Sequence, residues 1–216
     1  MGKSFSLERL GQIYMDAKQY VIHCGFSHEI DWQEELRFED LDEARFLKEI
    51  AWVILSSGMR ETVIRKKFGA VSKAFLNWTS SSIIYAKRDI CYTEALIYFN
   101  NKPKIQAIID IASYVHKHGF ENVRKKIEQY GIEFLIKFPF IGPATSLHLA
   151  KNLGLEVAKP DRHLTRIACN IGYPSVENLC TEIAKITGEK ISVVDIVLWR
   201  FATLDNKYLD YFVSNT

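Results

Sequence analysis

Helical periodicity is the feature that most limits what this chain can fold into. Nearly every segment places apolar residues three and four positions apart, as one face of a helix requires, and strictly alternating runs are scarce. Strict alternation is typical of a strand with one buried face, so its scarcity argues against a sheet. We therefore predict an all-α protein.

Capping residues mark the ends of the expected helices. A buried central helix starts with Asp40 and Glu43 at capping-box spacing and stops at Gly58, and another runs from Pro103 to Gly119. Further helices are expected over 120–130, 143–153, 162–170 and 175–187.

The last long helix is expected to begin with Ser192 and Asp195 as a capping box. It carries "VVDIVLWRFATL", an apolar stripe that we expect to close the core.

The composition is that of an ordinary globular protein. Of 216 residues, 48% are apolar, and there is no repeat or low-complexity run. Such a length forms one compact unit or two small lobes that share a core. The amino terminus carries acids early and no window is long and apolar enough to cross a membrane, so we expect neither a signal peptide nor a membrane partner. The expected location is the cytoplasm or nucleoid, or the nucleus in a eukaryote.

The cysteines do not indicate a metal site. They are widely separated, with no Cys-x-x-Cys pair and no histidine at ligand spacing. We expect reduced, buried side chains at Cys24, Cys91, Cys169 and Cys180.

Charge is distributed unevenly along the chain. Residues 1–50 hold 6 Lys/Arg against 11 Asp/Glu, and residues 51–216 hold 22 against 15, so their net charges are −5 and +7. A basic later region fits contact with a polyanion, and a solvated surface explains it equally well.

A very short turn, "FPFIG" at 138–142, joins two of the expected helices. Because so short a turn keeps the helices close, its backbone is expected to be exposed at their tip. The amides of Gly142 and the next residues then point outward at a helix amino terminus, which is a ready site for phosphate.

Asp161 lies nineteen residues after Gly142, in "KPDRHLTRIA". Pro160 restricts the chain before it, and an acid in front of an amphipathic helix is usually its N-cap. A carboxylate fixed there can also serve catalysis. The position alone leaves both roles open and favours the cap.

Four features follow one another here: the turn, a helix, a short linker, and the acid with Arg162, His163 and Arg166 after it. This order resembles the helix-hairpin-helix superfamily of DNA glycosylases. That superfamily includes endonuclease III and the adenine and 3-methyladenine glycosylases. "FPFIGPATS" occupies the hairpin, and Asp161 the catalytic acid. Upstream, "FLKEIAWVILSSGMRETVIRKKFGAV" is similar to the family's buried helix and duplex-probing loop, and "YFNNKPKIQAIIDIA" to a later helix start.

The resemblance implies one glycosylase unit over residues 1–216 with a DNA-binding cleft between two lobes. One lobe spans about 46–155 and contains the hairpin, and the other spans about 1–45 plus 156–216. The implied partner is double-stranded DNA, bound by a monomer without a cofactor.

The implied activity is excision of a damaged, mismatched or modified base that is flipped into the cleft. The carboxylate of Asp161 would stabilise an oxocarbenium-like sugar and orient or deprotonate water. One alternative is a helix-hairpin-helix binding module that has lost its chemistry. Another is a helical interaction domain that binds no nucleic acid.

The resemblance also suggests further site residues. Contacts to the DNA backbone are expected from Phe140, Ile141, Gly142, Ala144, Thr145, Lys102, Lys104, Arg162 and His163. The vacated space and the base pocket are expected to involve Trp52, Ser57, Met59 and Arg60, with Ser56 nearby. A plain helix-ending turn at Gly58 explains this loop equally well. The only metal considered is a monovalent cation on the hairpin carbonyls.

Two departures from the family affect the expected chemistry. Ala144 stands where bifunctional members carry the Lys that attacks the sugar, so the resemblance implies a monofunctional enzyme. Phe140 stands where the family has glycine, and a side chain disfavours positive φ there. The iron–sulfur loop of some members is absent, because no Cys follows Cys180. Three lysines near the hairpin could supply a weak lyase activity, and neutralisation of phosphate is their favoured role: Lys137, Lys151 and Lys159.

Other candidates have stronger structural explanations. Glu61 is a candidate second acid, and a solvated glutamate in a first helical turn is the favoured alternative. Aromatic candidates for stacking on the base, each more typical of a core, are Tyr14, Tyr20 and Trp32.

Overall fold

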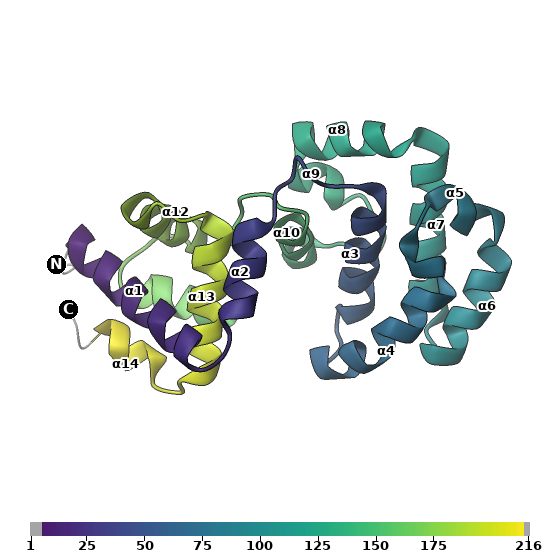
Figure 1. The fold of residues 1–216 in the computed structure, drawn as a ribbon. Coiled ribbons are helices and arrows are strands. Elements are labelled where there is room, and N and C mark those ends of the chain that lie inside the picture. The colour runs from purple at the N-terminus through teal and green to yellow at the C-terminus, as the bar shows by residue number, and fades with distance from the viewer. Residues whose placement is uncertain (1–5, 214–216) are drawn as a thin grey trace. The chain divides into compact units, whose positions relative to one another are not determined.

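The computed structural model describes residues 6–213, which form helices joined by turns and contain no strand (Figure 1). The predicted all-α class is confirmed. The elements are α1 (Leu7–His23), α2 (Ser27–Glu35), α3 (Glu43–Ser56), α4 (Glu61–Ala74), the 3₁₀ turn η1 (Leu76–Trp78), α5 (Ser81–Ala86), α6 (Arg88–Tyr98), α7 (Lys102–His118), α8 (Phe120–Tyr130), α9 (Ile132–Leu135), α10 (Pro143–Asn152), α11 (Arg162–Asn170), α12 (Val176–Thr187), α13 (Ile191–Leu204) and α14 (Tyr208–Val213).

The chain divides into two compact units. Within the described range, unit 1 comprises residues 6–36 and 154–213, and unit 2 comprises residues 37–153. The chain therefore passes from one unit to the other after Leu36 and after Leu153. In unit 2, Arg45 Nη2 donates to the carbonyls of Arg37 and Leu153, at 3.0 and 2.8 Å, and so ties the two ends of that unit together.

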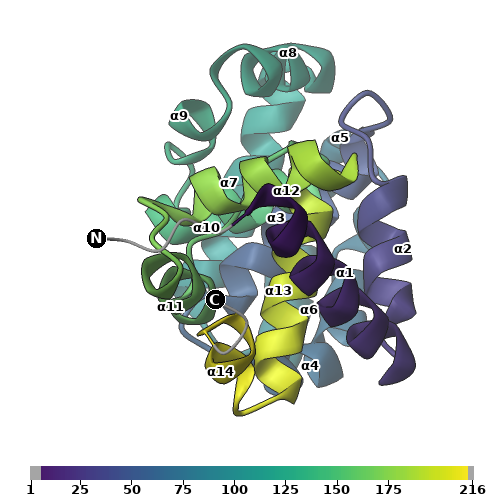
Figure 2. The same cartoon turned by 90° about the vertical axis from the view of Figure 1, so that its left-hand side faces the viewer.

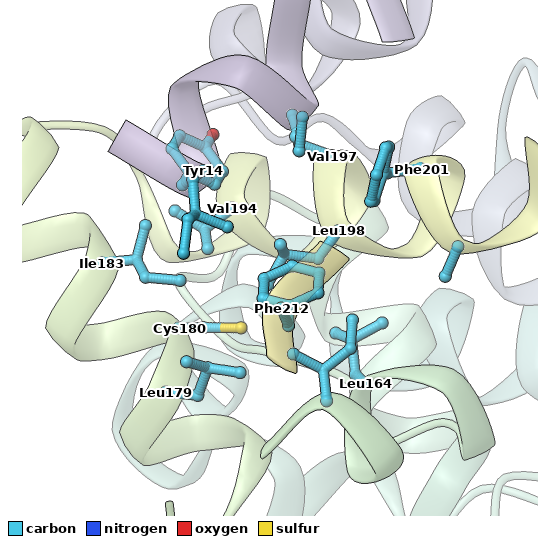
Figure 3. Packing of buried hydrophobic residues seen from close by; sticks show 14 of the residues in the cluster. Tyr14, Leu164, Leu179, Cys180, Ile183, Val194, Val197, Leu198, Phe201 and Phe212 are labelled. Atoms are coloured by element: carbon cyan, nitrogen blue, oxygen red, sulfur yellow. The ribbon is translucent and has the colours of Figure 1, made fainter. Parts of the chain in front are cut away.

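In unit 1, α13 is the central helix and packs against α1, α2, α11 and α12 (Figure 2). Val194, Leu198 and Phe201 of α13 belong to one buried cluster with Tyr14 of α1 and Phe212 of α14 (Figure 3). The expected role of this apolar helix in closing a core is confirmed.

In unit 2, α3 packs against α4, α7 and α10. Phe46, Ile50 and Ile54 follow one another at intervals of four residues, which places them on one helix face, and none is more than 1% exposed. Burial of each such side chain contributes about 1.5–3 kcal/mol. This face explains why the sequence forms a central helix here.

Several predicted helix ends are confirmed. Pro103 lies in the first turn of α7, and Gly119 is its C-cap with φ of 77°. Pro143 is the first residue of α10, and α11 has the predicted bounds. Ser175 caps α12, where its Oγ accepts from the Asn178 amide at 3.1 Å.

Two predicted capping boxes are wrong. The N-cap of α3 is Asp42, which accepts from the Arg45 amide at 2.7 Å, while Glu43 accepts from the Ser81 amide at 2.6 Å. The N-cap of α13 is Lys190, so Asp195 lies one turn inside the helix, where it is 2% exposed. Both acids chosen from the sequence instead accept hydrogen bonds from backbone amides distant along the chain: Glu43 from Ser81, and Asp195 from Lys159.

An unpredicted left-handed turn links α4 to α5. Leu76, Asn77 and Trp78 have φ values of 56°, 52° and 63°. This conformation is unfavourable for residues with a Cβ, so tertiary contacts must hold it. The Trp78 indole provides them: it is 2% exposed, stacks on Phe75 at 4.8 Å and donates to Ser72 Oγ at 3.0 Å.

The cysteine prediction is half right. Cys91 and Cys180 are buried, but Cys24 and Cys169 are exposed, and all four are reduced. Across residues 6–213, no group of His, Cys, Asp or Glu is arranged to hold a metal ion, and no helix has the length and apolarity needed to span a membrane.

Candidate nucleic-acid interface and catalytic carboxylate

The hairpin, residues 138–142, connects the short helix α9 to α10 in unit 2 (Figure 1). Phe138 and Ile141 are 8% and 4% exposed, and the Ile141 amide donates to the Phe138 carbonyl at 3.1 Å. Gly142 is the N-cap of α10. Two buried apolar side chains therefore anchor the turn, and its tip stays at the surface.

Thr145 accepts a hydrogen bond from one of the amides that were expected to bind phosphate. Its Oγ1 accepts from the Gly142 amide at 2.7 Å and lies 3.4 Å from the Phe140 carbonyl. The expectation that the Gly142 amide points outward is therefore wrong. The amides of Phe140, Ala144 and Thr145 take part in no hydrogen bond among the described residues, so these three remain for an anion at the helix start.

Phe140 adopts the left-handed conformation, with φ of 63°. The turn thus keeps the backbone shape of a glycine although it carries a phenyl ring, at a cost of about 1–2 kcal/mol. Phe140 therefore has the positive φ that its side chain disfavours. The ring itself is 43% exposed.

Lys104 was expected to contact the DNA backbone, but its side chain is buried in unit 2. It is 6% exposed, and its Nζ donates to the carbonyls of Leu55 and Ser57 at 3.0 and 2.6 Å, where α3 ends. Burial lowers the pKa of this ammonium, because the charged form loses its water. The same Nζ lies 6.0 Å from the centre of the Phe140 ring. Lys104 therefore joins α7, the end of α3 and the hairpin.

The α3–α4 loop, residues 57–60, lies at this junction. Gly58 has φ of 68°, Met59 is 43% exposed and Arg60 is the exposed N-cap of α4. Ser57 Oγ donates to the Ile54 carbonyl at 3.0 Å, which ends α3 neatly. The loop thus presents Met59 and Arg60 to solvent in the same unit as the hairpin.

Packing within unit 2 accounts for two other candidates. Trp52 is half-buried, meets Phe68 edge-on at 5.0 Å and has the Arg65 guanidinium 5.8 Å from its ring centre. Glu61 is exposed and bonds to Arg65 at 2.8 Å, which is the solvated first-turn role that was favoured. Lys102 is exposed in the first turn of α7.

Asp161 is the N-cap of α11 in unit 1. Its Oδ1 accepts from the amides of His163 and Leu164, at 2.9 and 2.8 Å. Its Oδ2 accepts no hydrogen bond from any described residue, and the side chain is half-buried. The cap fixes the carboxylate and leaves one of its oxygens for another partner.

Asp195 holds the chain just before Asp161, a role that the sequence prediction missed. Its Oδ1 accepts from the Lys159 amide at 2.7 Å, and the Asp161 amide bonds back to the Lys159 carbonyl at 2.9 Å. Pro160 is thereby enclosed in a tight turn with both ends fixed. The available signal was an acid inside the apolar stripe of the last long helix, because a buried carboxylate needs a partner.

His163 has partners at both ring nitrogens. Nε2 accepts from Arg162 Nε at 3.2 Å, so the neutral ring carries its proton on Nδ1 and donates to Tyr208 Oη, also at 3.2 Å. Arg162 is exposed beside it. The pair extends the polar surface next to Asp161.

The aromatic candidates of unit 1 separate by burial. Tyr14 is fully buried and donates to the Glu189 carboxylate; burial and that acid raise the pKa of Tyr14 above its ordinary value. Tyr20 and Trp32 are exposed. Tyr14 is therefore a core residue.

No protein-family model and no curated protein sequence matches the chain. Among solved structures, it is similar to Methanocaldococcus jannaschii 8-oxoguanine glycosylase/lyase in complex with a 15-mer DNA containing 8-oxoguanine, with 17% identity and a TM-score of 0.56 over 88% of this chain and 97% of that one. A structure of the 8-oxoguanine DNA glycosylase of the same organism gives 17% and 0.56, over 90% and 95%. The chain has the all-α fold of these glycosylases.

Proposed function

We propose that this protein is a DNA N-glycosylase, which hydrolyses the bond between a base and its deoxyribose. The observation that carries the proposal is the Asp161 carboxylate, held at a helix start through Oδ1 with Oδ2 uncommitted, in a chain with a glycosylase fold. The position of Asp161 after the hairpin matches the catalytic acid of the superfamily that the sequence resembles.

The chemistry follows from the charge of that carboxylate. As the base departs with the bonding electrons, positive charge develops on the sugar, and a fixed carboxylate stabilises it. Water then attacks the anomeric carbon, and Oδ2 accepts the proton that the water loses. Because the carboxylate already caps the helix, its position is fixed before the reaction, and it needs to move little as the charge on the sugar develops.

Unit 2 would supply most of the DNA backbone contacts. It holds 18 Lys/Arg against 12 Asp/Glu, a net charge of +6, whereas unit 1 holds 10 against 14, a net charge of −4. The uncommitted amides of Phe140, Ala144 and Thr145 lie in this basic unit and suit a phosphate. Met59 and Arg60 are exposed and suit the space that a flipped base vacates.

The proposed enzyme is monofunctional. Ala144, in the first turn of α10, stands where bifunctional members carry the attacking amine, and of the nearby lysines Lys151 is buried while Lys137 is exposed. Borohydride treatment during turnover should trap no protein–DNA adduct, and strands should break only after heating in alkali. A trapped adduct would show lyase activity and refute this part of the proposal.

Mass spectrometry of released bases tests the activity. The duplex panel should include 8-oxoguanine, on which the similar archaeal proteins act by name, with alkylated bases, mismatched uracil and thymine, and hypermodified bases. We expect one base class to be released with an abasic site left behind. Tight duplex binding without release of any base would instead support the binding module, for which the capping role of Asp161 is the supporting observation.

A further inference from the structure

Phe140 is a residue that neither the turn nor the core requires. Its φ of 63° is a conformation that glycine adopts without strain, so a phenyl ring works against the turn. Strain of this kind persists where the side chain has another use. The ring of Phe140 is therefore expected to have a function outside the turn.

The ring is not there to fill the interior. It is 43% exposed, while its neighbours Phe138 and Ile141 are 8% and 4% exposed and anchor the turn. Phe138 makes aromatic contacts with Phe46 and Phe134, but among the described residues the only ring or cation contact of Phe140 is to Lys104 Nζ, 6.0 Å from the ring centre.

That cation gives the ring a fixed place. Lys104 cannot move freely, because its Nζ is bonded to the Leu55 and Ser57 carbonyls and is almost fully buried. The attraction between an ammonium and an aromatic face favours a ring position beside this junction. The ring is thus an exposed apolar surface with a favoured place.

This surface lies next to donors that suit an anion. Phe140 contributes both the ring and one uncommitted amide, and the other two uncommitted amides belong to Ala144 and Thr145. In a nucleotide the apolar sugar lies directly beside the phosphate. An aromatic ring and a group of amides in the same turn are complementary to that pair of groups.

We propose that the Phe140 ring packs against the deoxyribose of the nucleotide whose phosphate the hairpin amides bind. The proposal rests on the proposed function, since it takes DNA as the ligand. It adds a sugar contact by a side chain to a motif expected to use only its backbone. The strained phenylalanine thereby increases affinity for DNA at the expense of turn stability.

Phe140→Gly separates this role from a structural one. The variant removes the ring and relieves the strain, so the melting temperature should stay the same or rise by up to about 4 °C. Affinity for a duplex containing a tetrahydrofuran abasic-site analogue should fall about tenfold, as expected for loss of one aromatic contact. The dependence of affinity on salt should keep its slope, because no charge is lost. Tyr98→Ala, which removes another exposed aromatic ring of unit 2, should leave the affinity unchanged.

A scan with single ribonucleotides identifies the sugar. Each deoxyribose around the abasic-site analogue is replaced in turn by ribose, which adds a polar hydroxyl to the sugar surface. Wild type should lose affinity at one or two positions, and Phe140→Gly should not respond there, since the two changes remove the same contact.

Any of three results would overturn the proposal. The first is unchanged DNA affinity in Phe140→Gly, and the second is a lower melting temperature of that variant, which would show that the ring serves to support Lys104. The third is an equal response of wild type and variant to every ribonucleotide. Failure of the wild type to bind the abasic-site duplex would instead refute the proposed function.

Discussion

At the scale of single residues, the candidate site depends on buried charged side chains that bond to the main chain. Asp195 accepts the Lys159 amide, and Lys104 donates to two carbonyls at the end of α3. A charge taken out of water is tolerated only where such bonds replace the lost solvent. The positions of Asp161 and of the α3–α4 loop are therefore set by residues that need not touch DNA.

Asp195 offers a direct test of this positioning. Asp195→Ala leaves the Lys159 amide without its acceptor, which costs about 1–3 kcal/mol of stability and releases the turn before Asp161. We expect the single-turnover rate of base release to fall at least tenfold while the affinity for duplex DNA changes less than twofold. Both are measured on the same substrate.

The matched variant is Asp195→Asn, which keeps an oxygen acceptor at the same place. It should restore most of the rate. Equal damage in both variants, or a loss of stability with an unchanged rate, would argue against a positioning role.

At the scale of elements, one half-buried acid joins the central helix α3 to the second helix of the hairpin motif. Glu49 of α3 accepts from Asn152 Nδ2 of α10 at 2.9 Å. Burial raises the pKa of Glu49 above its usual range, and the bond to Asn152 only partly offsets this. Folding therefore favours the protonated form of this acid more than the unfolded chain does.

This shift predicts how stability changes with pH. A folded-state pKa above the unfolded one gives stability that is fully present below the unfolded value, near 4.3, and is lost as pH rises through the raised value. Glu49→Gln stays neutral and keeps the acceptor for Asn152. Its urea midpoint should therefore exceed that of wild type at pH 7 and match it near pH 4. An equal difference at both pH values would contradict the assignment.

The positions of the helices were predictable from the sequence, but the hydrogen-bond partners of the acidic side chains were not. Pro103 with Gly119, and Asp161 before an amphipathic run, located α7 and α11 because these signals act on adjacent backbone. Asp195 looked like a cap, yet it bonds to a residue 36 positions away. Caps depend on local sequence, whereas burial depends on contacts between distant segments.

The candidate site was predictable to a similar depth. The turn at 138–142 and the capping position of Asp161 were expected from the sequence, but the role of Thr145 in occupying the Gly142 amide and the burial of Lys104 were not. Both features arise where separate elements meet, and helical periodicity carries no information about such meetings.

At the scale of the whole molecule, charge is divided between the two units. Unit 2 carries a net charge of +6 and unit 1 of −4, although the chain as a whole is near neutrality at +2. A polyanion is attracted to a local concentration of charge more than to the total. The basic unit is also the one that contains the hairpin and the α3–α4 loop.

Binding to duplex DNA should therefore depend steeply on salt. If four to six phosphates are contacted, the logarithm of the binding constant should fall with the logarithm of salt concentration with a slope of about −4 to −5. Fluorescence anisotropy between 50 and 300 mM salt would measure it. A flat dependence would favour the helical interaction domain that binds no nucleic acid.

The most direct test of the account is the rate of base release by Asp161→Asn, under single-turnover conditions on the best substrate of the wild type. Asn caps helices as well as Asp does, so fold and DNA affinity should persist while the charge is lost. We predict a rate about 100-fold to 1,000-fold lower than that of wild type. A rate equal to that of wild type would show that Asp161 is only a cap and would contradict the proposed mechanism.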